Sequence, residues 1–351
     1  MPVADCWIIE NYTYRRCPSP AREFNCAVSL HNHSDQSIEN MAFLNEVVKL
    51  RFMRPFRGLL QSAFGLAGIA DLNYADIYYR SPLTAEDVFL AESASAEDLG
   101  FKGVHLGITD HDEVSGSLEL GRAHPEAAHR NPLGEEISIH FDDYLFHLGV
   151  TGMPAAGAEQ LHRELQAAAR ECRLDDLFEM LQSSGALVIF NHPLVPWGKD
   201  SSRKIPAEAL LSRYGWAIHA LEYNGMRSKK ENDSVLQLAR QVGKPVIGGG
   251  DSHLLLASSV LSLTQAASFQ AFAEEVKEGH AVSLILPTFF APLSWKIFLR
   301  VLYFIAHYRS IGYFRGQPVG KLLRDRTVLL DPVGFVSRGF LSATSALGLM
   351  R

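Results

Sequence analysis

A short apolar run near the N-terminus ends in two histidines that are separated by one residue: Val28-Ser29-Leu30-His31-Asn32-His33-Ser34. Successive side chains on a β-strand point to opposite faces, so His31 and His33 would present two imidazoles to the same side of a strand end. Two imidazoles placed in this way can bind one metal ion. Five later strand-like runs also end in His, Asp or Glu, and this repetition favours a fold in which several strand ends meet.

Apolar runs of strand length alternate with helical stretches along most of the chain. The runs cover residues 103–108, 134–138, 144–150, 186–190, 218–221, 245–248 and 281–286, and the helical stretches cover residues 83–99, 157–184 and 229–241. Such alternation predicts parallel strands joined by crossover helices. Parallel barrels and open sheets place their chemistry at the carboxyl ends of the strands. About seven strands favour a closed or nearly closed α/β barrel over a doubly wound sheet.

Eight residues at these strand ends form a candidate ligand set. They are His31, His33, His111, Glu136, His147, His192, Asp251 and His253. Imidazoles and carboxylates without thiolates suit Zn, Mn or Fe, and they suit a hydrolytic site better than a structural one. The four cysteines include no Cys-x-x-Cys pair, which argues against a thiolate zinc site and against a disulfide framework, and suits a reducing cytoplasm.

The charge is distributed unevenly along the chain. Residues 292–351 hold nine Lys or Arg and two Asp, a balance of +7, so the rest carries −13 of the total of −6. An acidic body argues against duplex nucleic acid as the main partner. The basic tail leaves a membrane-surface contact open. The apolar stretch 292–309 is expected to be either a helix packed on the outside of the barrel or an interfacial membrane helix.

The sequence also predicts a division into segments. Residues 1–26 are expected to be an N-terminal lead-in, 27–290 the barrel domain and 291–351 a C-terminal extension. Residues 41–82 are expected to be an insertion, of which 41–69 would be a lid, an oligomer contact or a surface helix. Acidic residues near the start interrupt any signal-peptide pattern, so we expect a cytoplasmic protein.

The order and context of the ligand set resemble the polymerase and histidinol phosphatase (PHP) superfamily. The matching motifs, within residues 27–257, are Leu30-His31-Asn32-His33-Ser34, Ile108-Thr109-Asp110-His111-Asp112, Gly134-Glu135-Glu136-Ile137-Ser138, His147-Leu148-Gly149, Asn191-His192-Pro193 and Gly250-Asp251-Ser252-His253. The resemblance implies a distorted (β/α)7 barrel, of the TIM-like type, that binds two or three divalent metal ions.

The resemblance also implies a role for each ligand. His31, His33, Glu136 and Asp251 would hold the first metal, and Glu136 would bridge to a second metal held by His147 and His192. A third would be held by His111 and His253 with an acid of the first motif. This chain has Ile38 where the family often has Asp, so Glu39 is the nearest replacement and Asp35 the alternative. Glu135 competes with Glu136, but the Glu-Ile-Ser context favours Glu136.

Neighbouring divalent ions can share a water, lower its pKa and stabilise the attacking and leaving oxygens at a phosphoryl centre. Asp251, His192 or His253 could protonate the leaving oxygen. Arg227 is the first candidate for binding the substrate phosphate, followed by Lys199 and Arg203.

The sequence therefore predicts a metal-dependent phosphoesterase for a small phosphorylated metabolite or nucleotide. Three alternatives stay open: a phosphodiesterase or exonuclease on nucleotides or short single strands, a non-catalytic metal-binding scaffold, and a hydrolase of C–N bonds.

Overall fold

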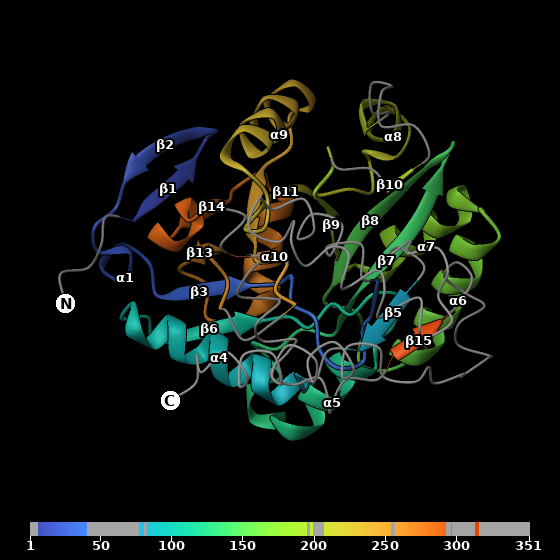
Figure 1. Ribbon diagram of the computed structural model, residues 1–351, viewed down its shortest axis with the longest axis horizontal. Coiled ribbons are helices and arrows are strands. Elements are labelled where there is room, and N and C mark those ends of the chain that lie inside the picture. The colour runs from blue at the N-terminus through green and yellow to red at the C-terminus, as the bar shows by residue number, and fades with distance from the viewer. Residues whose placement is uncertain are drawn as a thin grey trace, which may run out of the picture. The chain divides into compact units, whose positions relative to one another are not determined.

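The computed structural model describes residues 6–40, 77–80, 83–194, 197–198, 207–253, 257–292, 296 and 313–315. The chain divides into two compact units. The first consists of Met1–Ser37 and Leu83–Ala291, and the second of Ile38–Pro82 and Pro292–Arg351. Each unit is described by itself. Figure 1 labels the elements of both.

One six-stranded sheet of the first unit has the order β2-β1-β14-β13-β3-β6. Its strands are β1 (Trp7–Glu10), β2 (Thr13–Arg16), β3 (Cys26–Ser29), β6 (Gly103–Leu106), β13 (Val260–Thr264) and β14 (Val282–Ile285). Only β3 and β6 pair in parallel, and the other neighbours are antiparallel. All four residues of β3 are buried, so both faces of this interior strand are covered.

The other sheet of this unit has the order β10-β8-β9-β11-β12, with β7 paired to β8. Its strands are β7 (Gly134–Phe141), β8 (Tyr144–Thr151), β9 (Leu187–Asn191), β10 (Trp197–Gly198), β11 (Ala220–Asn224) and β12 (Val246–Gly249). β9, β11 and β12 run parallel, whereas β7, β8 and β9 are successively antiparallel. Every residue of β9, β11 and β12 is buried, as expected for parallel strands covered on both faces.

The predicted parallel barrel is therefore only partly matched: the fold is mixed α/β, and the described strands of the first unit pair as two sheets without closing a barrel. The two sheets are joined by isolated parallel bridges, His111↔Glu136 and Asn32↔Ser252. The expectation of parallel pairing throughout is wrong at several places. β1–β2 and β7–β8 are joined by two residues, and so short a loop produces an antiparallel hairpin. β8–β9 and β13–β14 are also antiparallel, although helices connect these strands. Residues 1–26, expected to be a lead-in, contain such a hairpin, with Asn11 and Tyr12 at positive φ between β1 and β2.

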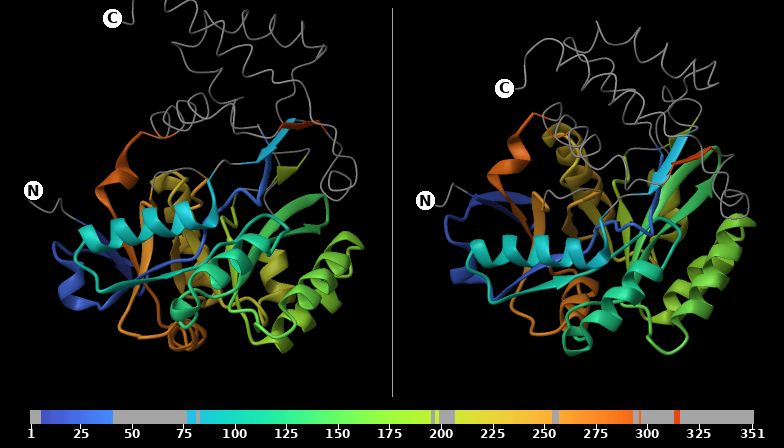
Figure 2. Two further views of the ribbon diagram at one scale, coloured as in Figure 1. Left: turned by 90° about the horizontal axis from the view of Figure 1, so that it is seen from below. Right: turned by 60° about the horizontal axis from the view of Figure 1, so that its bottom comes forward.

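Helices cover the strands of the first unit. They are α1 (Pro20–Glu23), α4 (Ala85–Asp98), α5 (Ser115–Ala123), α6 (Ala158–Arg170), α7 (Leu174–Ser184), α8 (Ala207–Tyr214), α9 (Lys229–Val242) and α10 (Phe269–Lys277), with 3-10 turns at Pro125–Ala127 and Pro287–Phe290. The expected helix over 83–99 is confirmed as α4, and Thr84 caps it by a reciprocal pair of hydrogen bonds with Asp87. α4 contacts β6, α6 contacts β7, and α9 contacts β11 (Figure 2).

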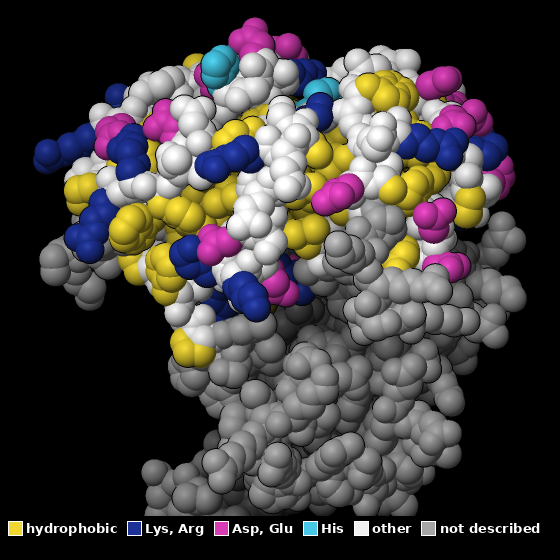
Figure 3. All heavy atoms as spheres, turned by 90° about the horizontal axis from the view of Figure 1, so that it is seen from above, with side chains coloured by type: hydrophobic (Ala, Val, Ile, Leu, Met, Phe, Trp, Pro, Cys, Tyr) yellow, Lys and Arg dark blue, Asp and Glu magenta, His cyan; other side chains and the backbone are white. Residues whose placement is uncertain are grey.

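The largest core cluster lies around the second sheet, where Phe178 and Phe190 are fully buried and Phe178 stacks on Tyr214 with ring centroids 4.2 Å apart. A smaller cluster packs α10 against β3 and β9 through Phe272, Val28 and Ile189. On the face shown in Figure 3, acidic and basic side chains are interspersed with apolar ones.

The described part of the second unit is a three-stranded antiparallel sheet of order β15-β5-β4. Its strands are β4 (Ile38–Asn40), β5 (Ile77–Arg80) and β15 (Tyr313–Arg315). The stretches 41–69 and 292–309, proposed for a membrane or oligomer contact, lie outside the described residues except for Pro292 and Lys296. Within the described part of the chain, no helix has the length and apolar character that a bilayer crossing requires.

Candidate metal centre

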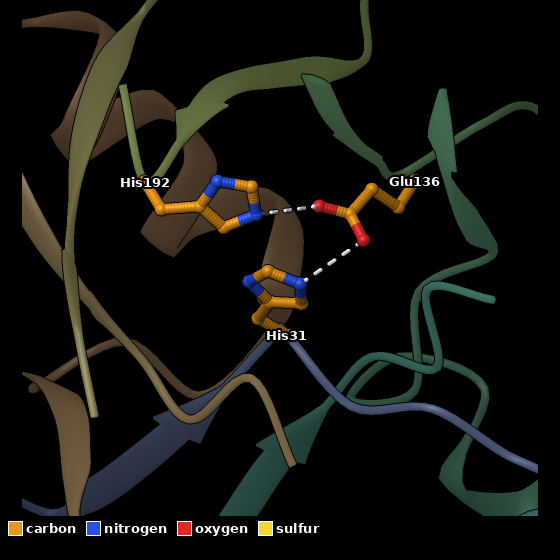
Figure 4. Close-up of side chains that lie close together, drawn as sticks. All are labelled: His31, Glu136 and His192. Carbon is orange, nitrogen blue, oxygen red and sulfur yellow. Dashed lines mark ion pairs between the residues drawn. The ribbon is translucent and has the colours of Figure 1, made fainter. Parts of the chain in front are cut away.

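The eight candidate ligands all belong to the first unit and meet at one place. Each lies in a strand or directly after one: His31 and His33 after β3, His111 after β6, Glu136 in β7, His147 in β8, His192 after β9, and Asp251 and His253 after β12. Figure 4 shows His31, Glu136 and His192 pointing toward one another from three different strands. Residues far apart in the sequence thus form one cluster, as the strand-end pattern predicts.

The carboxylate of Glu136 is the centre of the cluster, and it is fully buried. Its Oε2 atom lies 3.3 Å from His31 Nε2, 3.5 Å from His33 Nε2 and 3.0 Å from His111 Nδ1. The His33 ring also stacks against the His111 ring, with centroids 4.6 Å apart. One oxygen of this carboxylate therefore faces three imidazoles.

The other oxygen of Glu136 faces a different pair of histidines. Glu136 Oε1 lies 3.3 Å from His147 Nδ1 and 3.5 Å from His192 Nε2, and it accepts a hydrogen bond of 2.9 Å from Asn191 Nδ2. The two oxygens of one carboxylate thus point to two separate groups of imidazoles. A bridging carboxylate between two ions needs this arrangement.

Asp251 provides a second carboxylate on the same side as His31 and His33. Its Oδ1 atom lies 3.9 Å from the Nε2 atom of each of these histidines and 2.7 Å from His253 Nε2. Three groups of side chains have ligand atoms within 4.8 Å of one another and could each hold an ion. They are His31–Glu136–His192, His31–His33–Asp251 and His33–His111–Glu136.

Several of these ligand atoms are buried without a hydrogen-bond partner, among them His31 Nε2, His147 Nδ1 and Glu136 Oε2. Buried polar atoms are nearly always hydrogen-bonded, so a convergent group of unsatisfied atoms calls for an explanation. A divalent cation coordinated by imidazole nitrogens and carboxylate oxygens would satisfy all three. The residues present therefore fit a metal centre.

Electrostatics keeps both carboxylates of the cluster ionised, although Glu222 and Glu136 outweigh burial and raise the pKa of His31 well above its usual value. Burial opposes ionisation of Glu136, but His31, His111 and His147 outweigh it and hold its pKa well below the usual range. The pKa of Asp251 is likewise held well below its usual range, because His253 and other histidines outweigh burial. Burial lowers the pKa of His147. Ionised carboxylates and a neutral imidazole are the forms that bind metals.

Two of the candidate ligands have left-handed backbones, His192 with φ 29° and Asp251 with φ 50°. Residues other than glycine rarely adopt positive φ, and where they do it is often at functional sites. Both residues directly follow or lie just beyond a buried parallel strand, and the positive φ bends the backbone at this point beside the ligand cluster. The main-chain N–H of His192 donates to Glu222 Oε2 at 2.9 Å, which supports its bend.

Glu222 is the residue at the site to which the sequence assigned no role. It is buried in β11, and its Oε1 atom lies 2.5 Å from His31 Nδ1. The sequence did show Glu222 at a strand end, which was the available signal. Asp110 of the second motif likewise binds a residue beside a candidate ligand. Its carboxylate accepts hydrogen bonds from the main-chain N–H (2.5 Å) and the hydroxyl (2.7 Å) of Ser34.

Other predicted site residues lie elsewhere. Glu135 pairs with His162 at 2.8 Å, while the neighbouring Glu136 faces the cluster. Glu39 lies in β4 of the second unit, and its side chain is outside the described part. Lys199 and Arg203 also lie outside the described residues.

Arg227 follows β11 and is partly buried, and its Nε atom is buried without a hydrogen-bond partner. Its main-chain N–H donates to Asn224 O, at the end of the same strand. The guanidinium of Arg227 therefore has an N–H group that could donate a hydrogen bond to an anion.

No family model and no curated protein matches the sequence of this chain. Among solved structures, similarity is found to a candidate metal-dependent phosphoesterase from Bifidobacterium adolescentis (16% identity, TM-score 0.36, covering 50% of this chain and 84% of that one). An amidohydrolase from Chromobacterium violaceum with bound sulfate and no metal is also similar (15%, TM-score 0.41, 78% and 96%). A two-domain protein from Bacteroides vulgatus that contains a predicted PHP-like metal-dependent phosphoesterase is a third (14%, TM-score 0.39, 56% and 60%).

Proposed function

We propose that this chain is a metal-dependent phosphoesterase of the PHP type, built on a distorted barrel, that hydrolyses a small phosphorylated metabolite or nucleotide. The observation that carries the proposal is the buried Glu136 carboxylate, whose two oxygens face two separate groups of histidines. Hydrolytic centres that act on phosphoryl groups use a shared carboxylate to hold two ions side by side. The motif order along the sequence points to the same chemistry.

The residues divide between two or three ions in the proposed centre. His31, His33, Glu136 and Asp251 would hold the first ion, and Glu136 with His147 and His192 the second. His111 and His253 would hold a third together with an acid of the first motif. When bound, Zn, Mn or Fe ions would supply Lewis-acid stabilisation of phosphoryl oxygens and an activated water.

The protein side chains bind the substrate and supply protons. His111 and His253 are the members of the cluster with the most exposed side chains, at 18% and 11%, so substrate would reach the centre on their side. His253, paired with Asp251 at 2.7 Å, or His192 would protonate the leaving oxygen. Arg227 would bind a phosphate oxygen, as would Lys199 or Arg203.

The test is hydrolysis of p-nitrophenyl phosphate and of its bis ester by the full-length protein loaded with Mn²⁺ or Zn²⁺. We expect turnover by the wild type and none by His33→Ala, because His33 faces both Glu136 and Asp251. His124→Ala is a matched control, since this histidine pairs with Glu86 away from the cluster and its loss should leave turnover unchanged.

The other candidate functions give distinct results in the same assay. Turnover of the bis ester alone would indicate a phosphodiesterase. Tight metal binding without turnover of either ester would indicate a scaffold, or a hydrolase of C–N bonds if amide substrates are cleaved. Full activity of His33→Ala would contradict the proposed site.

A further inference from the structure

We propose that Glu222 is the positioning residue of this metal centre, holding His31 in the tautomer and orientation that leave its Nε2 atom for the ion. This inference rests on the proposed metal site but not on the nature of the substrate. None of the eight candidate ligands lies on β11, yet Glu222 of that strand is as deeply buried as they are, with 1% of its surface exposed. A buried carboxylate needs hydrogen-bond partners to offset its desolvation, and the partners of Glu222 indicate what it positions.

The first partner is His31. Glu222 Oε1 lies 2.5 Å from His31 Nδ1, and a carboxylate can only accept a hydrogen bond. The proton of His31 is therefore held on Nδ1, so the lone pair of the neutral ring is on Nε2. That atom lies 3.3 Å from Glu136 Oε2 and 3.9 Å from Asp251 Oδ1. A carboxylate behind a ligating histidine is a recurrent way to fix its tautomer and raise its basicity.

The other oxygen of Glu222 reaches the remaining strand ends. Glu222 Oε2 accepts the main-chain N–H of His192 at 2.9 Å and the side-chain amide of Asn224 at 2.9 Å. Asn224 Nδ2 also lies 3.2 Å from Asp251 Oδ2. Through these bonds Glu222 is connected to candidate ligands that follow β3, β9 and β12.

The neighbouring strand β12 has a glycine, Gly249, beside the carboxylate of Glu222. A Cβ atom at Gly249 of β12 would lie 1.8 Å from Glu222 Oε1, so a side chain at this position is incompatible with the observed placement of Glu222. The closely packed glycine and the three accepted hydrogen bonds are independent observations that point to a fixed carboxylate position.

Glu222→Gln tests the inference because it keeps the size of the side chain. A glutamine has one acceptor oxygen and one NH2 group. Whichever way the amide is turned, the NH2 group faces either His31 Nδ1 or the His192 N–H, both of which need an acceptor. Facing His31, it would favour the tautomer with a proton on Nε2, which blocks that atom for the ion.

The control is Glu135→Gln, on the neighbouring position of β7. Glu135 is also fully buried and also pairs with a histidine, His162 at 2.8 Å, but on the side of the strand away from the cluster. Both variants therefore remove one buried negative charge from a Glu–His pair, and only one pair includes a candidate metal ligand.

The measurement is the dissociation constant for Mn²⁺ by chelator competition, together with the ¹H–¹⁵N spectrum of the histidine rings in the Zn²⁺-loaded protein. We expect Glu222→Gln to weaken binding by roughly 10–100-fold and to lose the protonated Nδ1 signal of His31, with Glu135→Gln within about twofold of the wild type. Wild-type affinity in Glu222→Gln, or equal weakening in both variants, would overturn the inference. If the wild type binds metal but hydrolyses no ester, the proposed function fails while this result still stands.

Discussion

Replacing Gly249 by alanine should weaken metal binding without touching any candidate ligand. The new Cβ atom would lie 1.8 Å from Glu222 Oε1 and 2.7 Å from its Cδ atom, so the carboxylate must move by about 1.6 Å to reach an ordinary contact of 3.4 Å. That movement breaks the bond of 2.5 Å between Glu222 and His31. A hydrogen bond to a charged group contributes about 1.5–3 kcal/mol, and loss of such a supporting partner costs roughly 10–100-fold in metal affinity.

We expect Gly249→Ala to lose about 2–3 kcal/mol of unfolding free energy, which is about 3–4 °C in Tm for a chain of 351 residues, along with the loss of affinity. Calorimetric titration with Mn²⁺ and thermal unfolding of the metal-free protein measure the two effects separately. Gly121→Ala is the control. Its Cβ would meet Leu133 at 3.6 Å, an ordinary contact, within helix α5. Unchanged Mn²⁺ affinity in Gly249→Ala would refute the role given to the Glu222 carboxylate.

Three further outcomes are expected. Mn²⁺ at about 100 times its dissociation constant should stabilise the wild type by about 2.7 kcal/mol and Glu136→Gln much less; equal Tm shifts in the two proteins would contradict the bridging role. Burial lowers the pKa of His219 to about 4, whereas in the unfolded chain it is about 6.5. The contribution of neutral His219 to the free energy of unfolding is therefore fully present above pH 6.5. It falls by about 2–3 kcal/mol as the pH drops toward 4. His219→Gln still offers the Val188 N–H an acceptor. Between pH 7 and 4.5, its free energy of unfolding in urea should decrease less than that of the wild type. An equal decrease in the two proteins would disprove this. Thr84→Ala removes the cap of α4 and should cost about 1 kcal/mol in the same assay, with no effect on metal affinity.

Much of the candidate site could be predicted because its signal is local. A histidine or carboxylate that directly follows an apolar run is at a strand end, and such ends meet at one edge. His31, His192 and Asp251 can be assigned to one site from this pattern alone. The helices over 83–99 and 229–241 could also be predicted from the sequence, because a capping residue such as Thr84 acts within one helical turn.

The pairing of the strands was harder to predict, because an apolar run has the same composition in either direction. The run predicted over 134–138 extends to Phe141 in β7, so only two residues separate it from β8, and this short connection makes the pair an antiparallel hairpin. The hairpin in residues 1–26 was missed for a related reason, since its strands of four residues are only partly buried and lack a strong apolar pattern.

The amino-acid sequence shows which groups can bind a cation and that most of them follow apolar runs, because composition and spacing are local properties; Glu136 and His147 lie inside β7 and β8 instead. Three-dimensional packing, by contrast, turns one oxygen of Glu136 toward His31 and the other toward His192, and brings Glu222 Oε1 to His31 Nδ1. These relations join residues far apart in the sequence. They depend on which strands become neighbours and on tenths of an ångström in packing, such as the missing Cβ of Gly249, and neither is encoded in any short stretch of the chain.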